Sequence, residues 1–187
     1  TDIPSHRMAY VGSNYFLSGE TAGGLMGLMT KGEIHAGIVL GSRQILCHTD
    51  RVAGFRNCIQ KKYPHIHVTA TIQNQDDEVE SFHVTQTLLQ EHPEINALYF
   101  AAGGVYGGCK AIVAQNRAHA VTVITHDRVD TTRSFVQEGV ISATICQQPF
   151  LQGSQSLDIL FNYLTAGELP EKELNYVAAD IRIAENI

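Results

Sequence analysis

The chain has 187 residues, of which 44% are hydrophobic and 17% are charged, a composition typical of a folded globular protein rather than a disordered or fibrous one. Thirteen Lys and Arg residues against nineteen Asp and Glu residues give a net charge of −6, so no overall basic character favours contact with nucleic acid. The uncharged segment 97–108 is shorter than the roughly 20 apolar residues that a bilayer requires. We therefore expect a soluble chain that contacts neither membrane nor, by itself, DNA.

Short apolar segments alternate with longer segments of helical periodicity, which is typical of βαβ units that build a parallel sheet. The predicted strands are residues 36–40, 68–72, 97–101, 121–125 and 142–146, followed by a final extended segment at 176–183. The predicted helices are residues 19–29, 52–63, 76–90, 106–115, 131–137 and 151–164. The sequence therefore predicts an α/β fold with about six strand–helix cycles.

Polar side chains follow the predicted strands, where a parallel sheet forms its ligand crevice. They include Asp76, Asp127 and Gln147, and Arg51 lies near the loop that follows the strand at 36–40. Arginine offers a rigid fork of donors, carboxylates accept from pairs of hydroxyl groups, and glutamine does both. This set favours a polyhydroxylated small molecule such as a sugar, bound without reaction. For individual residues a structural interpretation stays open, because Arg51 suits a surface position at a helix start and Asp127 suits a turn or a helix cap.

Other chemistries lack their signatures. The glycines at 103, 104, 107 and 108 form neither Gly-x-Gly-x-x-Gly nor a loop ending in Gly-Lys-Ser/Thr, so we expect them to serve close packing rather than phosphate binding. His65 and His67 have no third ligand at a metal-like spacing. Cys146 and His126 carry no recognised nucleophile–base pattern. We expect no catalytic residue, no cofactor and no metal.

The four cysteines show no Cys-x-x-Cys pairing. A chain of this size does not need disulfides to fold. Reduced, partly buried thiols are the expectation, and this favours a cytoplasmic protein, although the even number keeps a disulfide open.

The order of several motifs resembles the ribose-type periplasmic binding protein fold (periplasmic binding protein type 1), which sugar-transport receptors share with the effector domains of LacI/GalR transcriptional regulators. The motifs are Tyr10-Val11-Gly12-Ser13-Asn14, Arg51-Val52-Ala53-Gly54-Phe55, His92-Pro93-Glu94-Ile95-Asn96-Ala97, Val123-Ile124-Thr125-His126-Asp127, and the run from Gly139 to Pro149 with Gly153. Their order and spacing cover nearly the whole chain.

The resemblance implies a Rossmann-like parallel sheet in each of two lobes, with the chain truncated at its N-terminus. Residues 13–147 and 176–187 are then the C-terminal lobe. Residues 1–12 and 148–175 are the crossover and a part of the N-terminal lobe.

The resemblance also implies ligand contacts. Arg51 matches the arginine of the Arg-x-x-Gly-Phe element that bonds sugar hydroxyls, Asp127 matches the acid after the fourth strand of the lobe, and Gln147 matches the hinge glutamine. Asp76 stands where a polar or aromatic contact often occurs, and Asp2 resembles the aspartate that enters the first crossover.

One loop departs from the family pattern. Where relatives offer Asn-Asp to the sugar, this chain reads Ala101-Ala102-Gly103-Gly104-Val105-Tyr106. Two hydrogen-bonding groups are thereby lost, and Tyr106 or the loop 73–77 is the candidate replacement.

Two functions follow from the resemblance. The first is the sugar-sensing domain of a cytoplasmic LacI-type repressor, a homodimer whose separate N-terminal helix-turn-helix head binds operator DNA. The alternative is the sugar-binding receptor of an ABC importer, located in the periplasm. The unpaired thiols and the entry Thr1-Asp2-Ile3-Pro4 favour the regulator, and the run from Ser142 to Pro149 suits the receptor at least as well.

Overall fold

The computed structural model describes residues 3–187 and divides the chain into two compact units. The smaller unit holds the described part of Thr1–Asn14 together with Gln147–Asp180. The larger unit holds Tyr15–Cys146 and Ile181–Ile187. The predicted ligand contact Asp2 lies outside the described residues.

A six-stranded sheet in the order β3-β2-β4-β5-β6-β8 forms the centre of the larger unit. Its strands are β2 (Ile34–Leu40), β3 (Ile66–Gln73), β4 (Ala97–Phe100), β5 (Thr122–His126), β6 (Ala143–Cys146) and β8 (Asp180–Arg182). The pairs from β3 through β6 are all parallel. The prediction of an α/β fold with a parallel sheet is confirmed.

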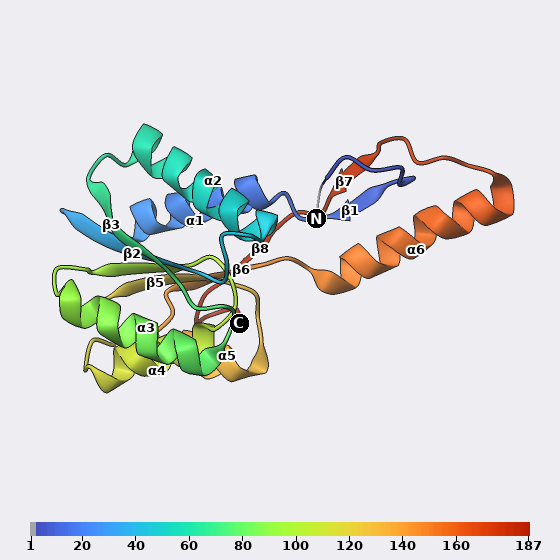
Figure 1. Ribbon diagram of the computed structural model, residues 1–187. Coiled ribbons are helices and arrows are strands. Elements are labelled where there is room, and N and C mark those ends of the chain that lie inside the picture. The colour runs from blue at the N-terminus through green and yellow to red at the C-terminus, as the bar shows by residue number, and fades with distance from the viewer. Residues whose placement is uncertain (1–2) are drawn as a thin grey trace. The chain divides into compact units, whose positions relative to one another are not determined.

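Helices cover both faces of this sheet (Figure 1). One face carries α1 (Tyr15–Met29) and α2 (Leu46–Lys62), and the other carries α3 (Glu78–Glu91), α4 (Val105–Ala114) and α5 (Asp130–Gln137). Strand β4 shows why both faces are apolar. Ala97 and Tyr99 point into the core under α1 and α2, whereas Leu98 and Phe100 point into the core under α3 and α4, because neighbouring side chains of a strand alternate between faces.

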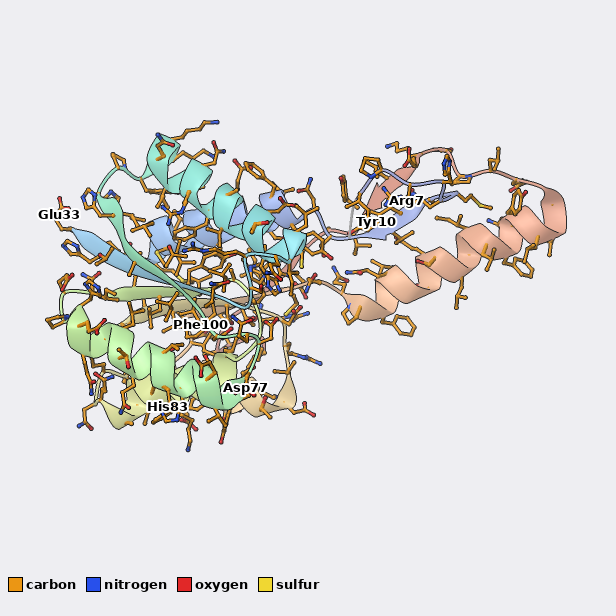
Figure 2. All side chains as sticks on the ribbon, in the orientation of Figure 1. Arg7, Tyr10, Glu33, Asp77, His83 and Phe100 are labelled. Carbon is orange, nitrogen blue, oxygen red and sulfur yellow. The ribbon has the colours of Figure 1, made fainter. Side chains whose placement is uncertain are left out.

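The smaller unit contains strand β1 (Tyr10–Gly12), paired in parallel with β7 (Leu174–Tyr176), and the helix α6 (Pro149–Ala166). Arg7 lies over the ring of Tyr10, its guanidinium carbon 5.1 Å from the ring centroid (Figure 2). Within the described structure no residue of α6 is buried. Large apolar side chains on the helix are therefore uncovered, among them Phe150 and Leu164, which are 88% and 71% exposed.

Several boundaries differ from the prediction. Helix α2 begins at Leu46 rather than at residue 52. The prediction was too short because the segment 46–51 reads as a polar loop, although in the structure it forms the first turns of the helix. Helix α1 likewise begins at Tyr15 rather than at residue 19. The extended segment predicted at 176–183 is the end of β7 followed by β8, and these strands belong to different sheets. No helix among residues 3–187 is both long and apolar enough to cross a bilayer.

Helices α1 and α2 approach each other through glycines. A Cβ atom added at Gly19 would overlap the backbone carbonyl oxygen of Arg51, and one added at Gly54 would overlap that of Phe16. Backbone atoms of a packed helix cannot move aside as a flexible side chain does. The close approach therefore requires glycine at both positions.

The contrast between two glycines of α1 tests this packing. We expect Gly19→Ala to lower the free energy of unfolding by about 3 kcal/mol, because the added methyl group forces the helices apart. Gly24 has no atom within 4 Å of an added Cβ, so Gly24→Ala should instead stabilise the protein by about 0.5–1 kcal/mol through its better helix propensity. Urea unfolding followed by circular dichroism measures both, and equal effects at the two positions would contradict the proposed contact.

Candidate functional site

Three of the predicted contacts lie at the carboxyl-terminal edge of the larger sheet. Asp76 follows β3 and Asp127 follows β5, and Arg51 lies in the second turn of α2, hydrogen-bonded to the residue after β4. Figure 2 shows Asp77, next to Asp76, at the end of the sheet opposite to Glu33. Gln147 follows β6 and belongs to the smaller unit, where its carbonyl oxygen accepts a hydrogen bond of 2.6 Å from Nε2 of Gln152.

Arg51 is a buried cation, with only 5% of its surface exposed. Its Nη1 donates to the carbonyl oxygen of Ala101 at 2.9 Å, and its guanidinium lies 5.3 Å from the ring centroid of Tyr15. Its Nε is buried and has no hydrogen-bond partner among residues 3–187. An unpaired buried donor is costly, so the guanidinium keeps hydrogen-bonding capacity that residues 3–187 do not use.

A buried aromatic pair lies beside Arg51. The hydroxyl of Tyr99 is 2.8 Å from Nε2 of His126, and the Tyr99 ring stacks on Phe55 with 4.7 Å between centroids. Burial, together with the nearby charge of Arg51, holds the pKa of His126 well below its usual range, and burial raises the pKa of Tyr99. Both rings are therefore neutral at pH 7.

His48 connects α2 to the loop after β3. The backbone N–H of Ser42 donates to its Nδ1 at 3.2 Å, which places the imidazole proton on Nε2, and Nε2 lies 3.9 Å from Oδ2 of Asp76. Burial lowers the pKa of His48 more than the Asp76 carboxylate raises it, and Arg51 lowers it further. The imidazole is thus neutral at pH 7 and faces the carboxylate as a neutral N–H group.

The sequence analysis named the loop 73–77, which contains Asn74, but it did not predict that Asn74 and Glu78 hold the glycine-rich loop after β4. Asn74 is fully buried, and its Nδ2 donates to Oγ of Ser81 at 3.1 Å and to the carbonyl oxygen of Gly103 at 2.8 Å. Glu78 accepts from the backbone N–H of Gly107 at 2.6 Å. The available signal was Asn74, a polar residue directly after a buried strand. This pattern did not reveal that the side chains of Asn74 and Glu78 bind the loop after β4.

Asp76 belongs to the same arrangement. Its Oδ1 accepts from the backbone N–H of Gly103 at 2.8 Å, and its own N–H donates to Oδ1 of Asn74 at 3.1 Å. A Cβ atom at Gly41 would overlap the Asp76 carboxylate. One carboxylate oxygen is therefore used in positioning the loop, while the side chain remains 38% exposed.

These contacts explain why the glycine cluster is not a phosphate loop. Gly104 has φ +76°, and a Cβ there would overlap Nδ2 of Asn74; a Cβ at Gly107 would overlap the carbonyl oxygen of Glu78. The glycines allow α4 to approach α3, and the N–H groups of Gly103 and Gly107 already bind carboxylates.

Asp127 is held in a left-handed backbone conformation, with φ +67°. Its backbone N–H donates to the carbonyl oxygen of Ile145 at 2.9 Å, and its own carbonyl oxygen accepts from Oγ1 of Thr144 at 2.8 Å. Both bonds connect the end of β5 to β6. They fix the direction in which the half-buried Asp127 side chain leaves the sheet.

Tyr106 lies in the first turn of α4, where its ring packs against Phe135 of α5 with 5.6 Å between centroids. Nζ of Lys110 lies 5.8 Å from the Tyr106 ring centroid. The structure thus brings Tyr106 together with α5. No contact with Arg51, Asp76 or Asp127 is among its ring interactions within the described residues. In residues 3–187 no group of three or more His, Cys, Asp or Glu side chains is arranged to hold a metal ion.

Comparison with known proteins identifies relatives over most of the chain. The sequence profile of the family described as periplasmic binding protein domain matches residues 1–169. The D-allose-binding periplasmic protein of Escherichia coli K12 is 26% identical over 110 residues, which are 58% of this chain and 35% of that protein.

Solved structures of sugar-binding proteins match nearly all of the chain. GanP, a glucose-galactose binding protein from Geobacillus stearothermophilus, superposes with a TM-score of 0.91 and 26% identity over 100% of this chain and 66% of that one. The arabinose-binding AraP of the same organism gives a TM-score of 0.87 and 26% identity, covering 97% of this chain and 65% of that one. A sugar-binding protein of a sugar ABC transporter from Bacillus halodurans gives 0.89 and 27%, covering 97% and 66%. The chain thus spans about two thirds of the length of these solved relatives.

The neutral His126 predicts a pH dependence of stability. Its pKa is lowered in the folded protein, so below about pH 6.5 the unfolded chain binds a proton that the folded chain does not. We expect the free energy of unfolding to be constant above that pH and to fall by about 1 kcal/mol per pH unit between pH 6 and 5. Urea unfolding at several pH values measures it. His126→Gln should flatten this slope, whereas a slope unchanged in the variant would contradict the assignment.

Proposed function

Because the chain belongs to the periplasmic binding protein domain family, we propose that it is the sugar-binding part of a receptor that serves an ABC importer. The names of its relatives support this proposal, since they describe proteins that bind allose, glucose and galactose, or arabinose, and one of them belongs to a sugar ABC transporter. The proposed activity is reversible binding without chemical conversion. The proposed location is outside the cytoplasmic membrane.

The buried guanidinium of Arg51 is the observation that carries this proposal. Its Nε has no partner among the described residues, while Nη1 is used on the Ala101 carbonyl. A sugar hydroxyl can accept from a guanidinium N–H group and at the same time donate to a neighbouring carboxylate. We propose that Arg51 donates to the sugar and that Asp127 accepts from it.

The remaining predicted contacts enter the proposal with different roles. Gln147 is proposed as a ligand contact from the smaller unit, and Asp76 as a contact through its exposed carboxylate edge. Asp2 stays a prediction outside the described residues, and Tyr106 stays a prediction because its ring packs on Phe135.

We further propose that the two units are the two lobes of the receptor. The solved relatives extend beyond the matched region by about a third of their length. The exposed apolar side chains of α6, including Leu157 and Phe161, need a covering surface in a soluble protein. In the proposed intact receptor the remainder of the first lobe covers them.

The regulator interpretation is the second candidate. It requires an operator-binding head and a homodimer, whereas the relatives named above are sugar-binding proteins, one of them from a sugar ABC transporter. The thiols are compatible with it, since none of the four cysteines forms a disulfide within residues 3–187. Deletion of the gene distinguishes the receptor from the regulator. Loss of a receptor abolishes uptake of its sugar, whereas loss of a repressor changes the transcription of its target genes.

The binding proposal is tested by isothermal titration calorimetry of the intact protein with D-glucose, D-galactose, D-allose and arabinose. We expect saturable binding of at least one of them and a loss of about 30-fold or more in affinity in Arg51→Lys, because lysine lacks the planar fork of donors. Arg56→Lys is the matched control: Arg56 lies on the same helix, is exposed, and bonds Oγ1 of Thr71.

Affinity in Arg56→Lys should equal that of the unmodified protein. Equal affinity in Arg51→Lys would remove Arg51 from the site. Failure of the unmodified protein to bind a wider panel of pentoses, hexoses and polyols would contradict the proposed function.

A further inference from the structure

Strand β3 forms one edge of the larger sheet, with α2 on one of its faces and α3 on the other (Figure 1). Among the strands that the structure describes it pairs with β2 alone. The strand has eight residues, Ile66–Gln73, and none of them is Lys, Arg, Asp, Glu or Pro. Exposed edge strands commonly carry such residues, because an open edge without them pairs readily with another strand. The sequence of β3 thus gives its open edge little protection against an added strand.

The regular part of this edge is the segment Ala70–Gln73. The register with β2 shifts between Val68 and Ala70, so Thr69 is the extra residue of a β-bulge. A bulge twists an edge and hinders pairing with a further strand. The part of β3 that is open to an added strand therefore begins at Ala70.

The backbone of this segment directs hydrogen-bonding groups away from the sheet. Asn74, directly after β3, donates its N–H to the carbonyl oxygen of Leu40 in β2 at 3.0 Å. The side to which a residue directs its N–H and C=O groups alternates along a strand. The N–H and C=O groups of Thr71 and Gln73 consequently point to the open edge, where a further strand can bond them.

The α2 groove, of about 360 Å³, borders this segment on the face that carries α2. Arg43, Arg56 and Thr71 line it together with the apolar Leu40 and Val52. Nη2 of Arg56 donates to Oγ1 of Thr71 at 2.8 Å, which holds this guanidinium against the strand while using only part of its donor capacity. None of the described residues that line this groove is acidic. The groove is therefore suited to a carboxylate side chain, which a guanidinium binds through charge-assisted hydrogen bonds.

The α3 groove, of about 600 Å³, borders the same segment on the opposite face. Ile72 of β3 lines it together with Val84 and Leu88 of α3. Its titratable side chains are those of a carboxylate and two imidazoles, so it has no dominant sign of charge; they belong to His83, Glu91 and His92. The apolar side chains make this groove suited to an apolar residue.

We propose that the edge Ala70–Gln73, with the two grooves beside it, is the docking surface for a β-strand of another protein whose side chains alternate between acidic and apolar. Side chains of an added strand alternate between the two faces of the sheet. Its carboxylates then enter the α2 groove and its apolar side chains enter the α3 groove. Main-chain bonds to Thr71 and Gln73 supply affinity, and the grooves supply specificity.

A second copy of this chain is a poorer fit for the same edge. Two β3 strands paired antiparallel about a twofold axis bring the α2 face of one copy beside the α2 face of the other. Strand β3 holds no carboxylate for the arginine-lined groove of its partner. The charge of the α2 groove therefore favours a different protein. This inference is independent of the proposed sugar-binding function, since Arg43, Arg56 and Thr71 are not among the proposed ligand contacts.

The test is fluorescence anisotropy of labelled peptides with the intact protein. The probe is an eight-residue peptide, the length of β3, that alternates glutamate with valine. One matched peptide alternates lysine with valine, and another is the probe with its four central backbone nitrogens methylated. We expect saturable binding of the probe and affinities at least about tenfold lower for both matched peptides, which lack the carboxylates or the main-chain donors.

Charge reversal in the α2 groove tests the arginines. Arg56→Glu and Arg43→Glu should each weaken binding of the probe at least about tenfold. Lys61→Glu is the matched control, because Lys61 is exposed on the same helix but does not line the groove. Its affinity should equal that of the unmodified protein. In hydrogen–deuterium exchange the probe should protect the N–H groups of Thr71 and Gln73.

Several outcomes would overturn the proposal. They are absence of probe binding, equal affinity for the lysine peptide or the methylated peptide, and an equal loss in Lys61→Glu. If Arg56→Glu does not fold, Arg43→Glu on the exposed turn after β2 decides the same point. A dimer of the unmodified protein whose formation protects Thr71 and Gln73 from exchange would identify a second copy as the occupant and overturn the proposal. Each of these outcomes leaves the proposed sugar binding unaffected.

Discussion

The buried guanidinium of Arg51 connects the parts of the larger unit on which the candidate site depends. Its Nη1 bonds the carbonyl oxygen of Ala101 at the end of β4, and its face lies against the ring of Tyr15 at the start of α1. Its backbone carbonyl is the group that Gly19 approaches. One residue thereby joins two helices to the centre of the sheet, so the packing that stabilises the fold also fixes the donor proposed for the ligand.

The glycines and carboxylates of the larger unit depend on one another. Asp76 and Glu78 can reach the N–H groups of Gly103 and Gly107 only because no Cβ atom keeps α3 and α4 apart. In return, the carboxylates satisfy N–H groups that would otherwise lie unpaired at a helix start. The glycine-rich loop after β4 is therefore held by carboxylates from the loop after β3 and from the first residue of α3.

Burial decides the charge state of the site. His126 lies in the sheet with Tyr99 on one side, and His48 lies under the loop after β2, and in both the cost of removing a charged imidazole from water exceeds the attraction of any nearby acid. The histidines add hydrogen-bonding capacity but no positive charge at pH 7. Among residues 3–187, Arg51 is the single buried cation of this edge.

The local sequence pattern was sufficient to predict the alternation of strands and helices. Strands buried on both faces of a parallel sheet have continuous apolar sequences, such as Ala97–Phe100. It failed where tertiary contacts outweigh local preference. The first turn of α2 has no side-chain cap, and the buried His48 within it bonds the N–H of Ser42. The residues from 176 to 183 read as one extended segment, although they hold the end of β7 and the whole of β8, which pair in different sheets.

For the site, the sequence by itself determined that polar residues follow the strands and that Arg51, Asp76 and Asp127 meet at one edge, because the carboxyl ends of parallel strands share that edge. The tertiary structure decided what each of them is able to do. Burial and the bond to Ala101 made Arg51 a fixed donor, and the contact with Gly103 turned Asp76 toward the start of α4. Such contacts join residues that are far apart in the chain, and no local periodicity records them.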